Sequence, residues 1–318
     1  MARKAALIVY LGPSIALPTV QRIIGERATL AHFEGDSEQF RLALRTAEGL
    51  IDASLMVRLN ASLLDRARNL RAVTCAGTGS DHIDGPFLSS RGIMFSSLRD
   101  NTALLEEFTG AAELSWALLM ACGRRLVEAS QDVLAGHWRR EQFATAALRS
   151  KTLGLIGCGR LGRQVALYGE AFGMRVTGYD PLVDPWPQGI ERRTFDDLIE
   201  GSDYISIHVH LSPETRGMLS EDEFRRMRPG TILINTSRGA VIDEKALIDA
   251  LEDGQLFAAG LDVLTNEPPA MSDAITQCAR DNPRLILTPH YGGFTTDAVC
   301  ASVAHSTEKL LTFLQATK

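Results

Sequence analysis

Short apolar runs alternate with helical patterns along nearly the whole chain. In the first half, the runs predict strands near 6–10, 28–33, 55–58, 71–75 and 93–96, with helical patterns at 37–50 and 61–67. In the second half, they predict strands near 153–156, 174–179, 204–207, 231–234, 257–261 and 284–288, and helices at 160–172, 194–200, 221–227 and 243–252. Strands and helices in alternation are typical of parallel sheets covered by helices. We therefore expect an α/β protein with two doubly wound parallel-sheet domains.

The boundary between the two halves is not a flexible linker. Residues 104–126 form a long apolar helical pattern that ends in Gly123-Arg124-Arg125, and a helix this apolar needs cover from a domain interface or a second subunit. The final segment, 297–318, is an amphipathic helix too short to be a domain. We therefore expect residues 1–103 and 291–318 to form one domain, with a second domain, 104–290, inserted between them.

The most informative motif is a glycine loop, Gly157-Cys158-Gly159-Arg160-Leu161-Gly162. It lies between the predicted strand 153–156 and the predicted helix 160–172, and the next strand leads to Asp180. In this setting the first glycine permits a tight turn, the second lets a pyrophosphate approach the backbone, and the third lets helix and strand pack closely. The phosphates would lie at the helix N-terminus, where free amides and the helix dipole favour negative charge. The motif predicts a dinucleotide site.

Asp180 bears on the choice of coenzyme. It follows Gly162 by eighteen residues, about where a carboxylate receives the hydroxyls of the adenosine ribose. A carboxylate accepts hydrogen bonds from a free 2′-hydroxyl and repels a 2′-phosphate, and Pro181 and Leu182 supply no neighbouring cation. Arg192 and Arg193 lie further along and could fold back. The sequence therefore favours NAD over NADP.

Composition and charge narrow the class of protein. The 318 residues are 45% apolar and 23% charged, and the formal charge of −6 gives no reason to expect nucleic acid or an anionic membrane as partner. No apolar run approaches the roughly 20 residues that span a bilayer, and residues 1–10 fit a first buried strand better than a signal peptide. The five cysteines have no paired spacing, which fits free thiols in the cytoplasm and no metal site.

Three residues follow predicted strands in the second half and could act together. Arg238 follows 231–234, Glu267 follows 257–261, and His290 follows 284–288. Ligands bind at that edge in open α/β sheets. A histidine suits proton delivery to a carbonyl oxygen, a neighbouring carboxylate would raise its pKa and orient its ring, and an arginine can hold a carboxylate in bidentate fashion. Each residue alone could be an ordinary loop residue, but together they indicate hydride transfer to a 2-oxo acid.

Over nearly its whole length the chain resembles the D-isomer-specific 2-hydroxyacid dehydrogenases. The matching segments are 73–84, 112–114, the glycine loop with Asp180, 235–239, 260–268 and 287–293. The resemblance implies an NAD-binding Rossmann domain inserted into a flavodoxin-like substrate domain. It implies Arg238 on the substrate carboxylate and carbonyl, His290 as acid/base and Glu267 as its partner. It further implies that Gly77, Thr78 and Gly79 hold the substrate carboxylate, and that the coenzyme contacts His208, Val209, Thr236, Ser237, Asp262 and Gly292.

The resemblance leaves the substrate open. Arg58 lies close to where phosphoglycerate enzymes of the family use a cation for phosphate, and could equally be an ordinary strand-end residue. Trp138 matches a position that helps close the pocket of hydroxypyruvate reductases, and could instead anchor a dimer. Hydroxypyruvate, glyoxylate and 3-phosphoglycerate are therefore the candidate substrates, and a homodimer is expected. The alternative is a binding module that senses NAD(H), like the transcriptional corepressors among the C-terminal-binding-protein relatives.

Overall fold

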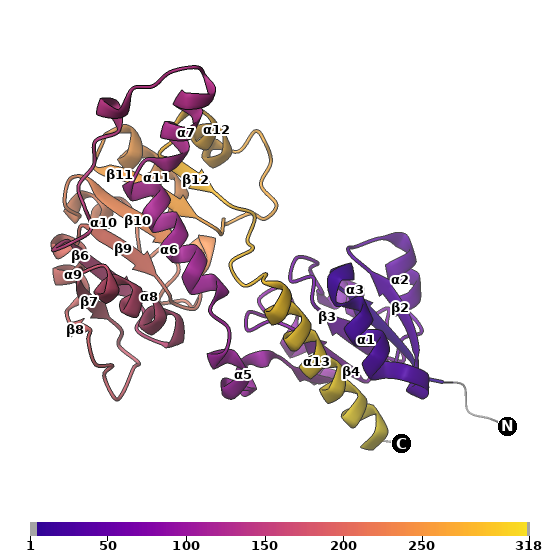
Figure 1. Cartoon of the computed structure of the whole chain (residues 1–318). Coiled ribbons are helices and arrows are strands. Elements are labelled where there is room, and N and C mark those ends of the chain that lie inside the picture. The colour runs from indigo at the N-terminus through magenta and orange to yellow at the C-terminus, as the bar shows by residue number, and fades with distance from the viewer. Residues whose placement is uncertain (1–4, 317–318) are drawn as a thin grey trace. The chain divides into compact units, whose positions relative to one another are not determined.

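The computed structural model describes residues 5–316, which form two compact units (Figure 1). Unit 1 contains the described residues up to Phe108 and those from Phe294 onward, and unit 2 is Thr109–Gly293. The chain thus passes between the units twice, and the boundaries expected from the sequence, 103/104 and 290/291, fall five and three residues before these passages. Residues 1–4 and 317–318, which belong to the expected terminal segments, lie outside the described residues.

Unit 1 is built on a five-stranded parallel sheet in the order β2-β1-β3-β4-β5, which is the flavodoxin-like order. Helices α1 and α13 pack on one face of this sheet, and α2, α3 and α4 pack on the other. The elements are β1 (Leu7–Leu11), α1 (Leu17–Ile24), β2 (Thr29–Phe33), α2 (Glu38–Leu44), β3 (Gly49–Asp52), α3 (Ala61–Leu64), β4 (Ala72–Cys75), α4 (Gly85–Ser90), β5 (Met94–Ser96), α5 (Thr102–Glu106) and α13 (Thr296–Ala316).

The third strand of unit 1 differs from the sequence prediction. No strand forms at 55–58; β3 occupies Gly49–Asp52 and overlaps the last two residues of the stretch 37–50 that was expected to be helical, and α2 ends at Leu44. Leu50 and Ile51 point to opposite faces of the sheet and are both fully buried, whereas Leu55 and Met56 are exposed. A central strand with apolar residues on both faces has no alternating pattern. The start of β3 was therefore assigned to the helical pattern that precedes it.

Unit 2 is built on a seven-stranded parallel sheet in the order β12-β11-β10-β9-β6-β7-β8. Counted within the unit, this is the Rossmann order 3-2-1-4-5-6 with one further strand. The elements are α6 (Gly110–Gly123), α7 (Leu126–Leu134), β6 (Thr152–Ile156), α8 (Arg160–Ala171), β7 (Arg175–Tyr179), β8 (Glu191–Arg192), α9 (Phe195–Gly201), β9 (Tyr204–Ile207), α10 (Glu221–Arg226), β10 (Thr231–Asn235), α11 (Glu244–Glu252), β11 (Leu256–Leu261), α12 (Ala274–Asp281) and β12 (Leu285–Leu287).

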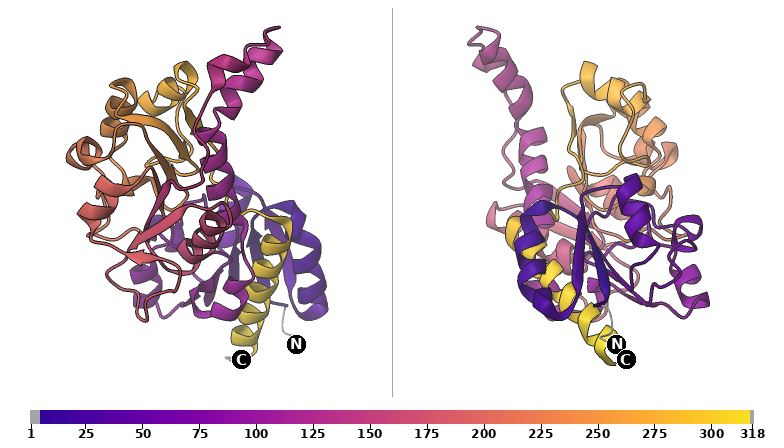
Figure 2. Two further views of the ribbon diagram at one scale, coloured as in Figure 1. Left: turned by 60° about the vertical axis from the view of Figure 1, so that its left-hand side comes forward. Right: turned by 90° about the vertical axis from the view of Figure 1, so that its right-hand side faces the viewer.

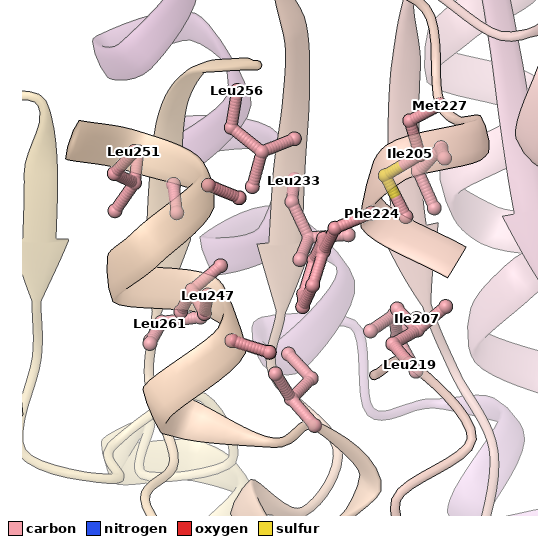
Figure 3. Packing of buried hydrophobic residues seen from close by; sticks show 14 of the residues in the cluster. Ile205, Ile207, Leu219, Phe224, Met227, Leu233, Leu247, Leu251, Leu256 and Leu261 are labelled. Atoms are coloured by element: carbon pink, nitrogen blue, oxygen red, sulfur yellow. The ribbon is translucent and has the colours of Figure 1, made fainter. Parts of the chain in front are cut away.

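Short 3-10 helices complete the two units, at Ser14–Ala16, Gly25–Arg27, Leu98–Asp100, Arg140–Phe143 and Gly239–Val241. In unit 2, each face of the sheet has its own apolar core. Helices α9 to α12 cover one face, where Phe224, Leu233 and Leu247 pack together (Figure 3). Helices α6 and α8 cover the other face. The two doubly wound parallel sheets agree with the fold class expected from the sequence.

The apolar segment 104–126 is not one helix. It divides at 107–109, where the chain passes between the units, so α5 belongs to unit 1 and α6 to unit 2. After α6, Arg125 adopts a left-handed φ of 50°, and α7 starts a new direction away from the rest of unit 2 (Figure 2). Hydrophobic periodicity alone does not reveal the break at 107–109, because apolar residues occur on both sides of it. Within residues 5–316, no helix is long and apolar enough to cross a membrane.

Candidate active site

The strands of unit 2 end in one row, and the polar residues of interest follow that row. Ile156, Ile207, Asn235, Leu261 and Leu287 are register partners across β6, β9, β10, β11 and β12. Parallel strands that end in register present the residues after them at the same edge of the sheet. The glycine loop, His208, Thr236–Arg238, Asp262–Glu267 and Thr288–His290 therefore all lie along one edge.

The three glycines of the loop each meet a different spatial demand. Gly157 has a φ of +96°, and a Cβ there would lie 2.6 Å from the carbonyl oxygen of His208. A Cβ on Gly162 would lie 2.1 Å from the carbonyl oxygen of Gly157, so helix and strand could not pack as they do. A Cβ on Gly159 would meet nothing within 4 Å, which leaves the N-terminal end of α8 open to a ligand. This loop suits a pyrophosphate at a helix N-terminus.

Asp180 is held against the glycine loop by backbone amides. Its Oδ2 accepts from the N–H of Cys158 at 2.8 Å, and its Oδ1 accepts from those of Leu182 (2.9 Å) and Val183 (3.2 Å). The arginines that could have neutralised a phosphate there have other partners. The Arg192 guanidinium lies over the Trp186 ring, 4.9 Å from its centroid, and Arg193 forms an ion pair with Glu191. These contacts fit a free 2′-hydroxyl better than a 2′-phosphate.

Arg238 is oriented by the turn that precedes it. Asn235, fully buried at the end of β10, accepts from the N–H of Ser237 (3.0 Å) and donates to the carbonyl of Arg238 (2.9 Å). The Arg238 guanidinium donates from Nη1 to the carbonyl of Ser237 at 2.7 Å. The following residue must be glycine, because a Cβ on Gly239 would lie 1.9 Å from the carbonyl carbon of Leu264. The loops after β10 and β11 are thereby packed backbone to backbone.

Asp262 joins the ends of β11 and β12. Its carboxylate is almost fully buried and accepts from Thr288 Oγ1 (2.6 Å) and from the N–H groups of Tyr291 (3.1 Å) and Gly292 (2.8 Å). Its backbone N–H donates to the carbonyl of Asn235 at 2.9 Å. Asp262 therefore fixes the backbone on either side of His290.

His290 and Glu267 form the expected pair. His290 Nδ1 lies 2.6 Å from Glu267 Oε2, and Glu267 Oε1 accepts from the N–H of Leu264 at 2.7 Å. The His290 side chain is 30% exposed, and within the described chain its Nε2 makes no hydrogen bond. His290 has a left-handed φ of 52°, uncommon for a residue other than glycine. The ring is thus held at one nitrogen, and the other is accessible to a ligand.

Electrostatics keep Glu267 charged. Burial alone would raise its pKa, but the hydrogen bonds from His290 and Leu264 and the positive charges of His290 and Arg238 together hold the pKa below its usual value. The effect of Arg238 on Glu267 places its charge near the pair. A charged carboxylate bonded to Nδ1 fixes the orientation of the His290 ring, and leaves Nε2 as the nitrogen that could exchange a proton with a carbonyl oxygen.

His208 is a second histidine at this edge, in a different environment. Burial lowers its pKa to about 4, so its ring is neutral at physiological pH. Nε2 lies 2.9 Å from Ser206 Oγ, while the buried Nδ1 has no hydrogen-bond partner among the described residues. Next to it, Val209 is half-buried, with its side chain 3.1 Å from where a Cβ of Gly157 would be. His208 and Val209 therefore border the glycine loop, but a buried neutral ring of this kind is a poor proton donor.

In unit 1, the loop after β4 has a conformation suited to an anion. The carbonyl of Gly77 accepts from the N–H of Leu98 (3.1 Å), that of Thr78 from Arg99 Nε (2.7 Å), and that of Gly79 from Cys75 Sγ (3.6 Å). Within the described chain, the N–H groups of these three loop residues donate no hydrogen bond. Bound carbonyls and free amides are what a carboxylate-binding loop requires.

The sequence predicted a strand at 55–58 with Arg58 at its end, but the structure has no strand there. With β3 ending at Asp52, Arg58 is an exposed residue of the loop between β3 and α3. Three supporting side chains in unit 2 were not predicted from the sequence. Asn235 orients the turn of Arg238, Thr288 bonds Asp262, and Ser115 Oγ of α6 lies 2.6 Å from Thr236 Oγ1. The signal for Asn235 was available, since it is a polar residue at the end of a strongly apolar strand.

A known protein family matches most of unit 2 in sequence. Residues 116–292, more than half of the chain, match the sequence model of the family "D-isomer specific 2-hydroxyacid dehydrogenase, NAD binding domain". The chain belongs to the D-isomer specific 2-hydroxyacid dehydrogenase family. This confirms the resemblance seen in the sequence.

Individual family relatives show how far the likeness extends. The chain is 34% identical over 295 residues to D-3-phosphoglycerate dehydrogenase of Mycobacterium leprae, an alignment that covers 92% of this chain and 54% of that protein. The chain thus spans about half the length of the curated relatives it matches. Its structure resembles the TT0316 protein of Thermus thermophilus (TM-score 0.85, 30% identity, 98% and 97% of the two chains covered). It also resembles D-lactate dehydrogenase of Aquifex aeolicus in complex with NAD and lactic acid (TM-score 0.81, 26% identity, 98% and 95% covered).

Proposed function

We propose that the protein is an NAD-dependent oxidoreductase that interconverts a small 2-oxo acid and its D-2-hydroxy acid. The observation that carries this proposal is the His290–Glu267 pair, joined at 2.6 Å through Nδ1 with Nε2 accessible. The pair stands at the sheet edge that also carries Arg238 and the glycine loop. Membership of the family and the NAD bound in the related D-lactate dehydrogenase support the same activity.

The residues of unit 2 fit NAD. We assign the pyrophosphate to the glycine loop with Arg160 and Leu161, and the adenosine ribose to Asp180. We assign the remaining coenzyme contacts to His208, Val209, Thr236, Ser237, Asp262 and Gly292. Two observations support this assignment. The space next to Gly159 is open, and Arg192 and Arg193 already contact Trp186 and Glu191. When bound, the coenzyme supplies or accepts the hydride.

The chain's own residues transfer the proton and bind the substrate carboxylate. In reduction, the proton on His290 Nε2 goes to the carbonyl oxygen of the substrate, and Glu267 stabilises the imidazolium and fixes the ring through Nδ1. Arg238 holds the substrate's carboxylate and carbonyl with its planar, always-charged guanidinium. In unit 1, we assign the substrate carboxylate to the free amides of Gly77, Thr78 and Gly79, as the family resemblance implies. In oxidation, His290 takes the proton back.

The test of this proposal is NADH oxidation, followed at 340 nm, with a panel of 2-oxo acids. The panel contains glyoxylate, hydroxypyruvate, pyruvate, phenylpyruvate and phosphohydroxypyruvate, and NADPH replaces NADH in a parallel series. We expect turnover with at least one acid and a kcat/KM at least about tenfold higher with NADH, since Asp180 repels a 2′-phosphate. If phosphohydroxypyruvate is preferred, the Arg58→Ala variant tests whether Arg58 binds its phosphate. NADH binding without turnover of any acid would contradict the proposal.

We further propose that the protein is a homodimer that pairs through α6 and α7 of unit 2. Leu134 and Trp138 are 85% and 84% exposed, next to a surface hollow of about 750 Å³ lined by Met120, Ala121 and neighbouring residues. The segment that carries them has a defined shape, because Arg125 bonds Glu128 and lies over the Phe143 ring. Large apolar side chains presented on an ordered segment are typical of an interface, and a second copy offers the same self-complementary surface.

Sedimentation or light scattering tests the dimer. We expect the wild-type protein to show about twice the chain mass of 34.7 kDa, and the double variant Leu134→Ser/Trp138→Ser to shift towards the monomer. Leu182→Ser is the matched control, because Leu182 is 90% exposed elsewhere on unit 2. A wild-type monomer, or equal dissociation of the control, would contradict this interface.

A further inference from the structure

Unit 1 contains a buried pair of polar residues that the proposed chemistry does not use. The carboxylate of Asp52, at the end of β3, has no exposed surface, and His82 Nε2 lies 2.6 Å from its Oδ2. Asp52 Oδ1 accepts from the N–H of Ser54 (3.2 Å) and from its hydroxyl (2.8 Å). A buried carboxylate is costly unless it is paired and hydrogen-bonded, so His82 is essential to this arrangement.

Asp52 holds both ends of the loop that carries Gly77–Gly79. At the start of the loop, the backbone carbonyl of Asp52 accepts from the N–H of Ala76 at 2.7 Å. At its end, the side chain of Asp52 bonds His82, whose own carbonyl accepts from the N–H of Leu59 at 2.8 Å. Asp52, a residue of the neighbouring strand β3, therefore links the first and last residues of the loop 76–82.

The third polar side chain nearby also acts on this loop. Asp52, Cys75 and His82 have possible metal-ligating atoms within 4.8 Å of one another. These atoms already have partners: the two carboxylate oxygens bond Ser54 and His82, and Cys75 Sγ lies 3.6 Å from the carbonyl of Gly79. The group is therefore better described as a set of contacts that hold the loop than as a set of metal ligands.

We propose that Asp52 and His82 are positioning residues that keep the loop 76–82 in its anion-binding conformation. This inference rests on the proposed function, in which the amides of Gly77, Thr78 and Gly79 bind the substrate carboxylate. Without His82, the Asp52 carboxylate is unpaired, and the end of the loop must move to let other donors or water reach it. An unpaired negative charge on the residue that joins the two ends of this loop also repels an anionic substrate. Both effects weaken substrate binding and leave coenzyme binding unchanged.

The experiment compares His82→Ala with His82→Gln, whose side-chain amide can still donate to Asp52. For the 2-oxo acid with the best turnover, we expect His82→Ala to raise KM by about tenfold or more with a much smaller change in kcat, and NADH Kd to stay constant. His82→Gln should restore KM to within about threefold of the wild-type value. Leu44→Ala is the control, because it removes buried side chain from the same unit without touching the loop. The KM of Leu44→Ala should equal the wild-type value even if its Tm falls as much as that of His82→Ala.

Hydrogen exchange supplies a readout that does not depend on turnover. In His82→Ala, the amides of 76–82 should exchange faster than in the wild type, while those of unit 2 exchange at the wild-type rate. If His82→Ala does not fold, His82→Asn replaces it, because the asparagine side chain is too short to reach Asp52. Equal KM and equal loop exchange in wild type and variant would overturn the inference, as would the same rise in KM in Leu44→Ala. A wild type that reduces no 2-oxo acid contradicts the proposed function instead, and loop exchange then decides the role of His82 by itself.

Discussion

Replacing His290 by asparagine should lower kcat for reduction of a 2-oxo acid by about 10²–10⁴-fold, the range that a positioned general acid contributes. NADH Kd should stay within about twofold of the wild-type value, because the glycine loop and Asp180 are untouched. Asparagine is the appropriate replacement because residue 290 has a left-handed φ of 52°, which asparagine tolerates better than alanine. The variant therefore removes the acid/base group while the backbone held by Asp262 keeps its shape.

The measurement is steady-state turnover together with a fluorescence titration of NADH. His32→Ala in unit 1 is the control, because it removes an imidazole that has no role in the proposed site and should leave kcat unchanged. A His290→Asn variant that keeps more than about a tenth of wild-type kcat would show that the proton comes from another group.

Arg238→Lys should lower kcat/KM by about tenfold to a hundredfold, equivalent to about 1.4–2.7 kcal/mol of transition-state stabilisation. Lysine keeps the charge, so the loss measures the planar, two-pronged guanidinium. The variant also loses the hydrogen bond from Nη1 to the Ser237 carbonyl, which holds the side chain in place. KM for the acid should therefore rise and kcat should fall, while coenzyme affinity is kept.

The matched control is Arg193→Lys, a conservative change at an exposed ion pair with Glu191. Its kinetics should equal those of the wild type, because surface pairs contribute little and lysine can replace arginine there. Identical kcat/KM in Arg238→Lys and the wild type would remove Arg238 from the substrate site.

The parts of the fold that the sequence predicted well are those with a local cause. Gly162 is required by a close backbone approach inside the loop itself, to Gly157, and the strands on either side of the loop have clear apolar runs. β3 was placed wrongly because part of its burial depends on a helix far away in the chain: a Cβ on Gly49 would meet Leu310 of α13 at 2.8 Å. No short window of sequence contains that information.

Some residues of the site could likewise be predicted from the sequence, and others could not. The positions of Arg238, Glu267 and His290 after strands could be read from the chain, since each strand has its own pattern. The pairing of Asp52 with His82 could not, because the two residues are 30 positions apart and neither has a local signal for the other. The row of register partners from Ile156 to Leu287 explains why a simple rule about strand ends located the unit 2 residues.

The return of the chain to unit 1 has a consequence for protein synthesis. Leu310, Leu311 and Leu314 of α13 pack in the same core as Ile8 and Tyr10, roughly 300 positions earlier. At about 5–20 residues per second, the roughly 200 residues between the first part of unit 1 and these leucines take about 10–40 s to translate. During that time unit 2 can complete its sheet, whereas β3 and β4 lack the helix that covers them. The order of synthesis therefore allows the inserted unit to fold before unit 1 is complete, and the N-terminal part of unit 1 stays partly uncovered until α13 is made.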